Sequence, residues 1–146
     1  MSKKYHVGFI AGTFDILHVG HLNILANCKK HCDKLIVGVC DDGYIKSCKM
    51  HNPIMNESDR LRIIQSLRYV DDAIIIGTTL TQDKLKIQKK LHFDVLFSGD
   101  DWKNTAIYKR TEKELAQIGV DVVYFPYTKG ISSTDIRNKI LKNKEN

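Results

Sequence analysis

The feature that most constrains the fold is an alternation, along the whole sequence, of short apolar runs rich in β-branched residues with segments of helical spacing. The runs that we expect to form strands are residues 6–11, 34–40, 73–76, 95–98 and 120–125. The segments that we expect to form helices are residues 20–32, 57–67, 82–91, 105–118 and 133–141. Such alternation is typical of βαβ units. The sequence therefore predicts an α/β fold with a doubly wound parallel sheet.

Residues that commonly begin or end helices lie at several of these boundaries. Asn56 can cap the second helix and Thr81 the third, while Ser132 with Asp135 forms a capping pattern for the last. Gly119 is well placed to end the fourth helix. No repeat or Pro/Gly-rich linker interrupts the sequence. We therefore expect a single domain over residues 1–146, with a polar C-terminal tail from about residue 142.

Length and charge limit the classes of function. A chain of 146 residues is long enough for one real core. No stretch approaches the roughly 20 apolar residues that span a bilayer, and no early segment has the pattern of a leader, so we expect a cytoplasmic protein without a membrane partner. The formal net charge of +6 suits an anionic partner. Because the basic residues are not interleaved with aromatic ones, nucleic acid is not the partner that we expect.

The four cysteines are Cys28, Cys32, Cys40 and Cys48, and we expect reduced thiols because a chain of this length does not need disulfides. Cys28 and Cys32, with His31 between them, lack a second pair of ligands at zinc spacing. We therefore interpret both as core or half-core positions on a helix. The sequence identifies no metal ligands.

The segment between the first expected strand and the first expected helix has the composition of a phosphate site. Gly12 lets the backbone approach a ligand, and the free N–H groups at the start of the following helix favour an anion. His18 and His21 are three residues apart, so both imidazoles can lean over the same anion. A glycine turn alone is a weak signal, but two histidines over a helix N-terminus are specific. The alternative is a solvated loop with two incidental histidines.

Three motifs follow expected strands, at residues 12–21, 98–102 and 127–134. The carboxyl ends of parallel strands share one edge of the sheet, and ligands bind outside that edge where the strand order reverses. The last motif again places glycine and hydroxyl groups at a helix N-terminus, which indicates a second phosphate cradle. Ser132 alone could also serve only as an N-cap.

These motifs together resemble a known family. They read Gly-Thr-Phe-Asp at 12–15, His-x-Gly-His at 18–21, Arg-Tyr-Val-Asp at 68–71, Gly-Asp-Asp-Trp at 99–102 and Gly-Ile-Ser-Ser-Thr at 130–134. In this order they resemble the cytidylyltransferase branch of the HxGH nucleotidyltransferase superfamily, and within it the glycerol-3-phosphate cytidylyltransferases. The resemblance runs from the first strand to about residue 140. It implies a Rossmann-like α/β domain that forms homodimers.

The resemblance also implies roles for individual residues. His18, His21 and Lys49 would be catalytic, with the imidazoles donating to phosphate oxygens. The nucleotide-binding residues that it implies are Gly12, Thr13, Phe14, His18, His21, Lys46, Asp100, Trp102, Tyr127, Thr128, Gly130, Ile131, Ser132, Ser133, Thr134 and Arg137. The residues that it implies for the acceptor are Lys84, Lys49 and Arg60, and those near the subunit contact are Arg68 and Asp71.

Several of these roles have alternatives. Lys46 and Lys49 compete for one position of the family. Lys84 could be a solvated helix lysine, and Arg60 could form a surface ion pair with Glu57, which would contribute little to stability. For Arg68 we favour a structural role over direct catalysis.

The implied reaction transfers CMP from CTP to a small phosphorylated alcohol, first of all sn-glycerol 3-phosphate, giving CDP-glycerol and pyrophosphate. Mg²⁺ would accompany the triphosphate without a dedicated protein cage. Tyr127 stands where family members have an arginine, for which Lys129 or Arg137 could substitute, and Arg137 matches the pattern of adenylyl-transferring relatives. The alternatives are a phosphocholine or phosphoethanolamine cytidylyltransferase, an adenylyltransferase, and a non-catalytic nucleotide sensor.

Overall fold

The computed structural model describes residues 5–145 and contains one parallel sheet. The strands are β1 (Tyr5–Gly12), β2 (Cys32–Cys40), β3 (Asp72–Ile76), β4 (Val95–Gly99) and β5 (Asp121–Phe125). They lie in the order β3-β2-β1-β4-β5, and every neighbouring pair is parallel. The order reverses at β1, between β2 and β4. The predicted doubly wound α/β fold is confirmed, and its switch point coincides with the turn that follows β1.

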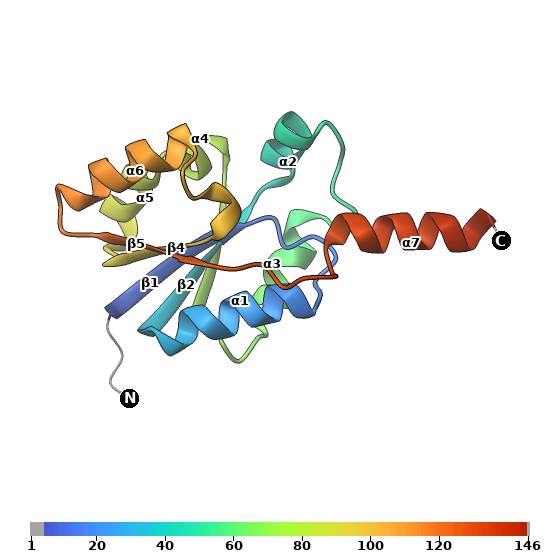
Figure 1. Ribbon diagram of the computed structural model, residues 1–146, viewed down its shortest axis with the longest axis horizontal. Coiled ribbons are helices and arrows are strands. Elements are labelled where there is room, and N and C mark those ends of the chain that lie inside the picture. Colours follow the sequence, from blue (N-terminus) through green and yellow to red (C-terminus); the bar gives the residue numbers. More distant parts are fainter. Residues whose placement is uncertain (1–4, 146) are drawn as a thin grey trace.

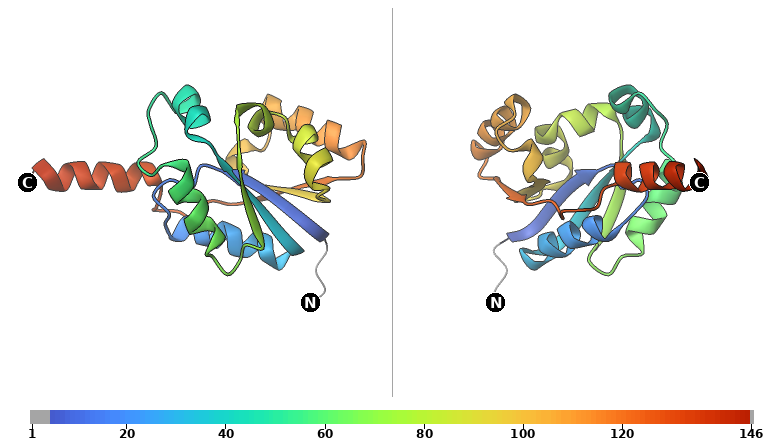
Figure 2. Two further views of the ribbon diagram at one scale, coloured as in Figure 1. Left: turned by 180° about the vertical axis from the view of Figure 1, so that it is seen from behind. Right: turned by 45° about the vertical axis from the view of Figure 1, so that its right-hand side comes forward.

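The helices are α1 (Val19–Lys30), α2 (Asp42–Lys49), α3 (Glu57–Gln65), α4 (Thr78–Gln82), α5 (Lys84–Leu91), α6 (Ala106–Ala116) and α7 (Ser133–Glu145), with a short 3₁₀ helix at Asp100–Trp102. Helices α1 and α3 cover one face of the sheet, and α4, α5 and α6 cover the other (Figure 1). Helix α7 extends away from the sheet and touches the domain only near its beginning (Figure 2).

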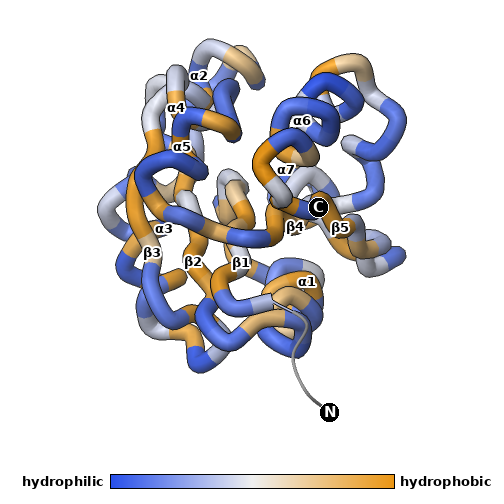
Figure 3. The backbone as a smooth tube through the Cα atoms, turned by 90° about the vertical axis from the view of Figure 1, so that its left-hand side faces the viewer, coloured by the Kyte–Doolittle hydropathy of each residue, from blue (hydrophilic) through white to orange (hydrophobic). Residues whose placement is uncertain are grey.

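Apolar side chains fill both spaces between sheet and helices. On the side of α1 and α3, Leu25 and Ile64 are fully buried against the strands. On the other side Phe9 of β1 stacks on Phe93 with ring centroids 5.1 Å apart. Hydrophobic residues accordingly concentrate in the strands (Figure 3). Because both faces are covered, the strands are rigid supports for the turns at their ends.

The structure differs from the sequence prediction in two connections. Helix α2 lies where we expected a loop. It was not predicted because it is only eight residues long and Ile45 is its one buried residue. The expected third helix is present as α5, but a separate short helix, α4, precedes it, and Asp83 caps α5 by accepting a hydrogen bond from the Lys86 N–H at 3.0 Å. The prediction that Thr81 is this cap is wrong, because Thr81 lies buried within α4.

Other boundaries agree with the expected signals. The Asn56 side chain accepts a hydrogen bond from the Asp59 N–H and caps α3. Gly119 has a φ of +75°, which suits the turn after α6. The expected polar tail is helical, because α7 continues to Glu145.

The four cysteines are free, and three of them are buried. Cys28 lies in α1 but Cys32 begins β2, so the two do not share a helix. Among the described residues, no three His, Cys, Asp or Glu side chains are grouped so that they could hold a metal ion. No helix in the range 5–145 is long and apolar enough to cross a membrane.

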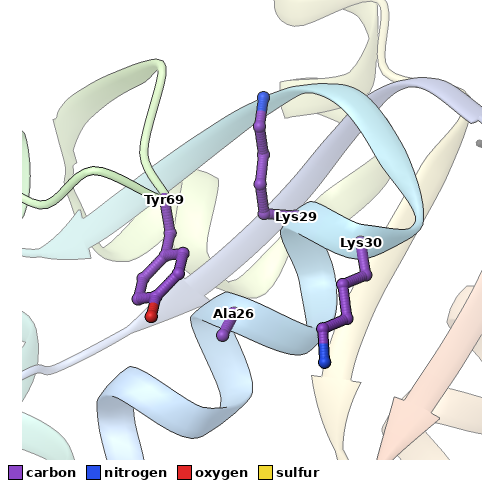
Figure 4. A pocket seen from close by; sticks show the side chains of 4 residues that line it. All are labelled: Ala26, Lys29, Lys30 and Tyr69. Carbon is purple, nitrogen blue, oxygen red and sulfur yellow. The ribbon is translucent and has the colours of Figure 1, made fainter.

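The predicted subunit-contact residues lie at the amino ends of the strands. The Asp71 carboxylate accepts hydrogen bonds from Lys29 Nζ at 2.6 Å and from the Leu35 N–H at 2.7 Å. Arg68 is exposed and lies over the Tyr69 ring at 5.3 Å. Tyr69 borders a shallow hollow of about 380 Å³ with Ala26, Lys29 and Lys30 of α1 (Figure 4). Asp71 is therefore structural, and this region lies far along the strands from the turn after β1.

Candidate active site

The turn from β1 to α1 has an unusual backbone. Phe14 and Ile16 have φ values of +52° and +54°, a region that β-branched and bulky residues rarely adopt. A Cβ on Gly12 would lie 2.8 Å from the Phe14 ring, so only glycine fits there. Strain of this kind costs on the order of 1–3 kcal/mol per residue and is typical of functional sites.

The two predicted histidines lie together at the start of α1. Their ring centroids are 3.9 Å apart, with an angle of 31° between the rings. His18 is the N-cap residue, and its Nδ1 accepts a hydrogen bond from the Gly20 N–H at 3.0 Å. His21 Nδ1 accepts one from the His18 N–H at 3.1 Å. The structure thus confirms that both imidazoles lie side by side, and it adds that each also caps the helix.

Both rings are neutral at physiological pH. The pKa of His21 is lowered to about 4, chiefly by burial and then by the charges of His18 and Lys49, while Asp15 opposes the shift. Burial also lowers the pKa of His18. Because each Nδ1 accepts a hydrogen bond, the proton of each neutral ring resides on Nε2. Each ring therefore offers one Nε2–H donor away from the helix backbone.

A cavity of about 450 Å³ lies between the beginnings of α1 and α7. The residues that line it are His18, Gly20, His21, Ile24, Lys49, Pro126, Tyr127, Thr128, Ile131, Ser132, Ser133, Thr134 and Arg137. The cavity thus combines the motifs that follow β1 and β5, as expected for motifs at one sheet edge.

The beginning of α7 forms one wall of this cavity. The Ser132 side chain accepts a hydrogen bond from the Asp135 N–H at 3.0 Å, so Ser132 is an N-cap as predicted. The Ser133 hydroxyl donates to the carbonyl oxygen of Asp15 at 2.6 Å. Asn23 of α1 donates through Nδ2 to Thr128 Oγ1 at 2.9 Å. These contacts fix the two helix N-termini to each other across the cavity.

Of the two candidate lysines on α2, the structure brings Lys49 to the cavity. Its Nζ donates to Thr13 Oγ1 at 3.3 Å. Lys46 is exposed and does not line the cavity. Thr13 therefore contacts Lys49 but does not itself line the cavity. Phe14 does not line the cavity either, and its ring packs against the His21 ring with centroids 5.5 Å apart.

The motif after β4 lies at the margin of the site. A Cβ on Gly99 would lie 2.9 Å from the Tyr127 ring, so this glycine lets Tyr127 lie over the strand end. Burial and the neighbouring Asp101 raise the pKa of the Tyr127 phenol. Asp100 is exposed, and Trp102 faces the Tyr108 ring at 5.3 Å. Neither Asp100 nor Trp102 lines the cavity, and neither does Gly130.

Arg60 does not lie at the surface. It is fully buried, and its guanidinium donates to the carbonyl oxygens of Thr13, Cys40 and Met55 at 2.7–2.9 Å. Its Nη2 pairs with Asp42 Oδ1 at 2.6 Å. The alternative of a surface ion pair with Glu57 is therefore wrong, because the buried guanidinium pairs with Asp42 instead. Arg60 joins the ends of β1 and β2 to α2, and so supports the cavity from behind.

Lys84 is buried as well, with 8% of its surface exposed. Its ammonium donates to the Thr81 carbonyl, and burial lowers its pKa. The alternative of a solvated helix lysine is thus excluded. Lys84 does not line the cavity, and its position beside Cys40 places it near the carboxyl end of β2.

A family model described as cytidylyltransferase-like matches residues 9–139. The chain belongs to the cytidylyltransferase-like family. The match covers every motif from β1 to the beginning of α7, including both histidines. The nucleotidyltransferase superfamily inferred from the sequence is confirmed.

Proteins similar to this chain include FAD synthases and bifunctional HldE proteins. The FAD synthase of Pyrococcus abyssi is 40% identical over 121 residues, which cover 81% of this chain and 78% of that protein. The FAD synthase of Thermococcus kodakarensis is 34% identical over 86% of this chain and 82% of its own length. The bifunctional protein HldE of Hyphomonas neptunium is 35% identical over 89% of this chain, but this chain spans only 26% of that protein.

Solved structures agree on the fold. The lipopolysaccharide core biosynthesis protein from Thermoplasma volcanium superposes with a TM-score of 0.70 at 28% identity, over 87% of this chain and 99% of that one. The pantoate-beta-alanine ligase from Francisella tularensis has a TM-score of 0.61 at 18% identity, over 97% of this chain and 72% of that one, and shows the fold alone. Membership in the cytidylyltransferase-like family thus supports an enzyme of the nucleotidyltransferase kind. These relatives do not single out glycerol-3-phosphate cytidylyltransferase.

Sequence reasoning gave no binding role to five residues at this site, and one of them, Gly20, lies between the two predicted histidines. Ile24 and Pro126 line the cavity, and Asn23 joins its two sides. No sequence pattern marks these three. Asp15 is buried beside Arg137, and the Gly-Thr-Phe-Asp motif contained it without suggesting a role.

Proposed function

We propose that this cytidylyltransferase-like protein transfers CMP from CTP to a small phosphorylated alcohol, with sn-glycerol 3-phosphate as the first candidate. The observation that carries this proposal is the pair of Nε2–H donors at His18 and His21, in a cavity that also contains Lys49, Arg137 and the start of α7. Such a site suits a polyphosphate rather than an apolar ligand.

The reaction needs little from the protein beyond alignment and charge. An oxygen of the acceptor phosphate attacks the α-phosphorus of CTP, the bond to the bridging oxygen of the β-phosphate breaks, and pyrophosphate leaves. The acceptor phosphate is largely ionised at pH 7, because its second pKa is about 6, so no general base is required. Stabilising the charge that develops and holding two anions in line are then the main tasks.

The described side chains divide these tasks. The two neutral imidazoles would donate to the α- and β-phosphate oxygens, where charge develops. Lys49 and Arg137 supply fixed positive charge, and the N–H groups at the start of α7 would hold the rest of the triphosphate. Mg²⁺ would enter with the triphosphate as part of the substrate. Buried Lys84 would receive the acceptor phosphate from the side of β2. We also propose that the chain forms a homodimer.

An adenylyltransferase is the second candidate. The observation that favours it is the similarity to two FAD synthases, which this chain matches over most of their length. Arg137 matches the arginine in the sequence pattern of adenylyl-transferring relatives, and it also lines the cavity. The Gly-Asp-Asp-Trp motif after β4 supports CTP as the first choice.

Pyrophosphate release separates these candidates. CTP and ATP are each combined with sn-glycerol 3-phosphate, phosphocholine or flavin mononucleotide, and His21→Ala measures any contaminating activity. We expect the fastest turnover with CTP and sn-glycerol 3-phosphate. Turnover with ATP alone would replace this proposal by the adenylyltransferase. Nucleotide binding without turnover on any of the acceptors would support a nucleotide sensor.

A further inference from the structure

A buried carboxylate lies against the cavity that we assign to a triphosphate. Asp15 is 4% exposed and follows Phe14 in the turn between β1 and α1. A negative charge in this place repels the substrate, and burying it costs free energy unless partners compensate. Its presence therefore calls for a function that outweighs both costs.

The partners of Asp15 come from segments far apart in the sequence. Its two carboxylate oxygens accept hydrogen bonds from the Ile54 N–H at 2.8 Å and the Met55 N–H at 3.0 Å. Its carbonyl oxygen accepts one from the Ser133 hydroxyl at 2.6 Å. One residue thus joins the turn that carries both histidines to the α2–α3 connection and to α7. The α2–α3 connection follows directly after the helix that carries Lys49.

Asp15 also faces the guanidinium of Arg137. Arg137 Nη1 lies 3.6 Å from Asp15 Oδ2, which is an ion pair too long for a hydrogen bond. Among the side chains of residues 5–144, this Nη1 is the one buried nitrogen or oxygen that makes no hydrogen bond. Arg137 lines the cavity, so the carboxylate holds its positive charge in place and leaves a donor unused.

We propose that Asp15 is a positioning residue, which assembles three walls of the nucleotide site before substrate binds and holds Arg137 ready for the triphosphate. This inference rests on the proposed function, because alignment matters only if a reaction follows. Misplacing reacting groups by about 1 Å can slow a reaction roughly 100-fold. Substrate binding is affected less, because loss of the negative charge offsets loss of order.

The main test compares Asp15→Asn with wild type. The variant keeps the size of the side chain but presents an NH₂ group to one of the two loop N–H donors and no charge to Arg137. We expect kcat to fall about 100-fold, while the dissociation constant of CTP changes less than about fivefold. Asp135→Asn is the matched control on the exposed first turn of α7, and we expect its kcat to stay within about twofold of wild type. CTP binding is measured by isothermal titration calorimetry. A kcat for Asp15→Asn within threefold of wild type would overturn the proposal.

Amide hydrogen exchange tests the same proposal without a reaction. In wild type the Ile54 and Met55 amides should exchange slowly although Ile54 is 66% exposed, and in Asp15→Asn they should exchange faster, as should residues 133–137. Rapid exchange at Ile54 and Met55 in wild type would refute it even if the variant did not fold. Failure of wild type to turn over any nucleotide would refute the proposed function instead, and the exchange result would still decide whether Asp15 holds these segments together.

Discussion

Replacing Arg60 by methionine tests whether this residue is structural or binds substrate. The guanidinium is fully buried and makes four hydrogen bonds, three to carbonyl oxygens and one to Asp42. Methionine has a similar length and leaves little empty space, so the loss is mainly that of the polar contacts. Removing one partner of a buried ion pair costs about 3–5 kcal/mol, and each carbonyl that stays unsatisfied adds about 1–3 kcal/mol. The Asp42 side chain is 37% exposed, and carbonyl groups in the turn can form hydrogen bonds with water instead. We therefore expect the free energy of unfolding to fall by about 3–5 kcal/mol in total.

Thermal unfolding measures this effect. For a domain of this size, 1 kcal/mol corresponds to about 2–4 °C, so Arg60→Met should lower the Tm by about 6–20 °C. Arg62 lies on the same helix and is exposed, so Arg62→Met is the matched control and should change the Tm by less than about 2 °C. An Arg60→Met protein with the Tm of wild type and a strongly raised KM for the acceptor would show that Arg60 contacts substrate and that our account of its burial is wrong.

Three further predictions concern the site. His21→Ala should lower kcat about 10²- to 10³-fold in the pyrophosphate assay, the usual loss for one preorganised donor, and an unchanged kcat would contradict its role. Lys84→Met should raise the KM for the acceptor without lowering the Tm. The position is buried and its burial lowers the pKa of Lys84, so an apolar side chain should fit there at no cost in stability. A lower Tm would mean that Lys84 is structural. Because the pKa of His21 is about 4 in the folded chain and about 6.5 unfolded, the unfolded chain binds the extra proton between these values. The Tm should therefore fall as pH decreases from 6.5 to 4, and less steeply in His21→Asn, whereas equal slopes would refute the shift.

The sheet could be predicted because its signal is local. Each strand is a short apolar run, and the five runs are covered on both faces, so neither face needs polar residues. The position of the site followed from the same pattern, because motifs after parallel strands must meet at one edge. His18 and Ser132 accordingly line one cavity although more than a hundred residues separate them.

What the sequence could not reveal is the burial of polar residues. Arg60 and Lys84 lie on helices rich in charged residues, whose composition suggests a surface, and the partners of Arg60 and Asp15 come from other parts of the chain. The two Asp15 hydrogen bonds to the α2–α3 connection involve backbone N–H groups, which no side-chain pattern can announce. Helix α2 escaped prediction for a related reason, since Ile45 alone anchors it and a single apolar residue has no period.

The spacing of the two histidines has a physical explanation in the structure. An imidazole that accepts a backbone N–H through Nδ1 cannot carry a proton there, so protonating His18 or His21 would break a cap of α1. Losing a cap costs about 0.5–2 kcal/mol, which adds to the cost of charging a half-buried ring. The cap therefore keeps each ring neutral with its proton on Nε2, and it also fixes the direction of that donor. A spacing of three residues lets the second ring reach back to the N–H of the first cap residue, so that two oriented donors arise from one helix start.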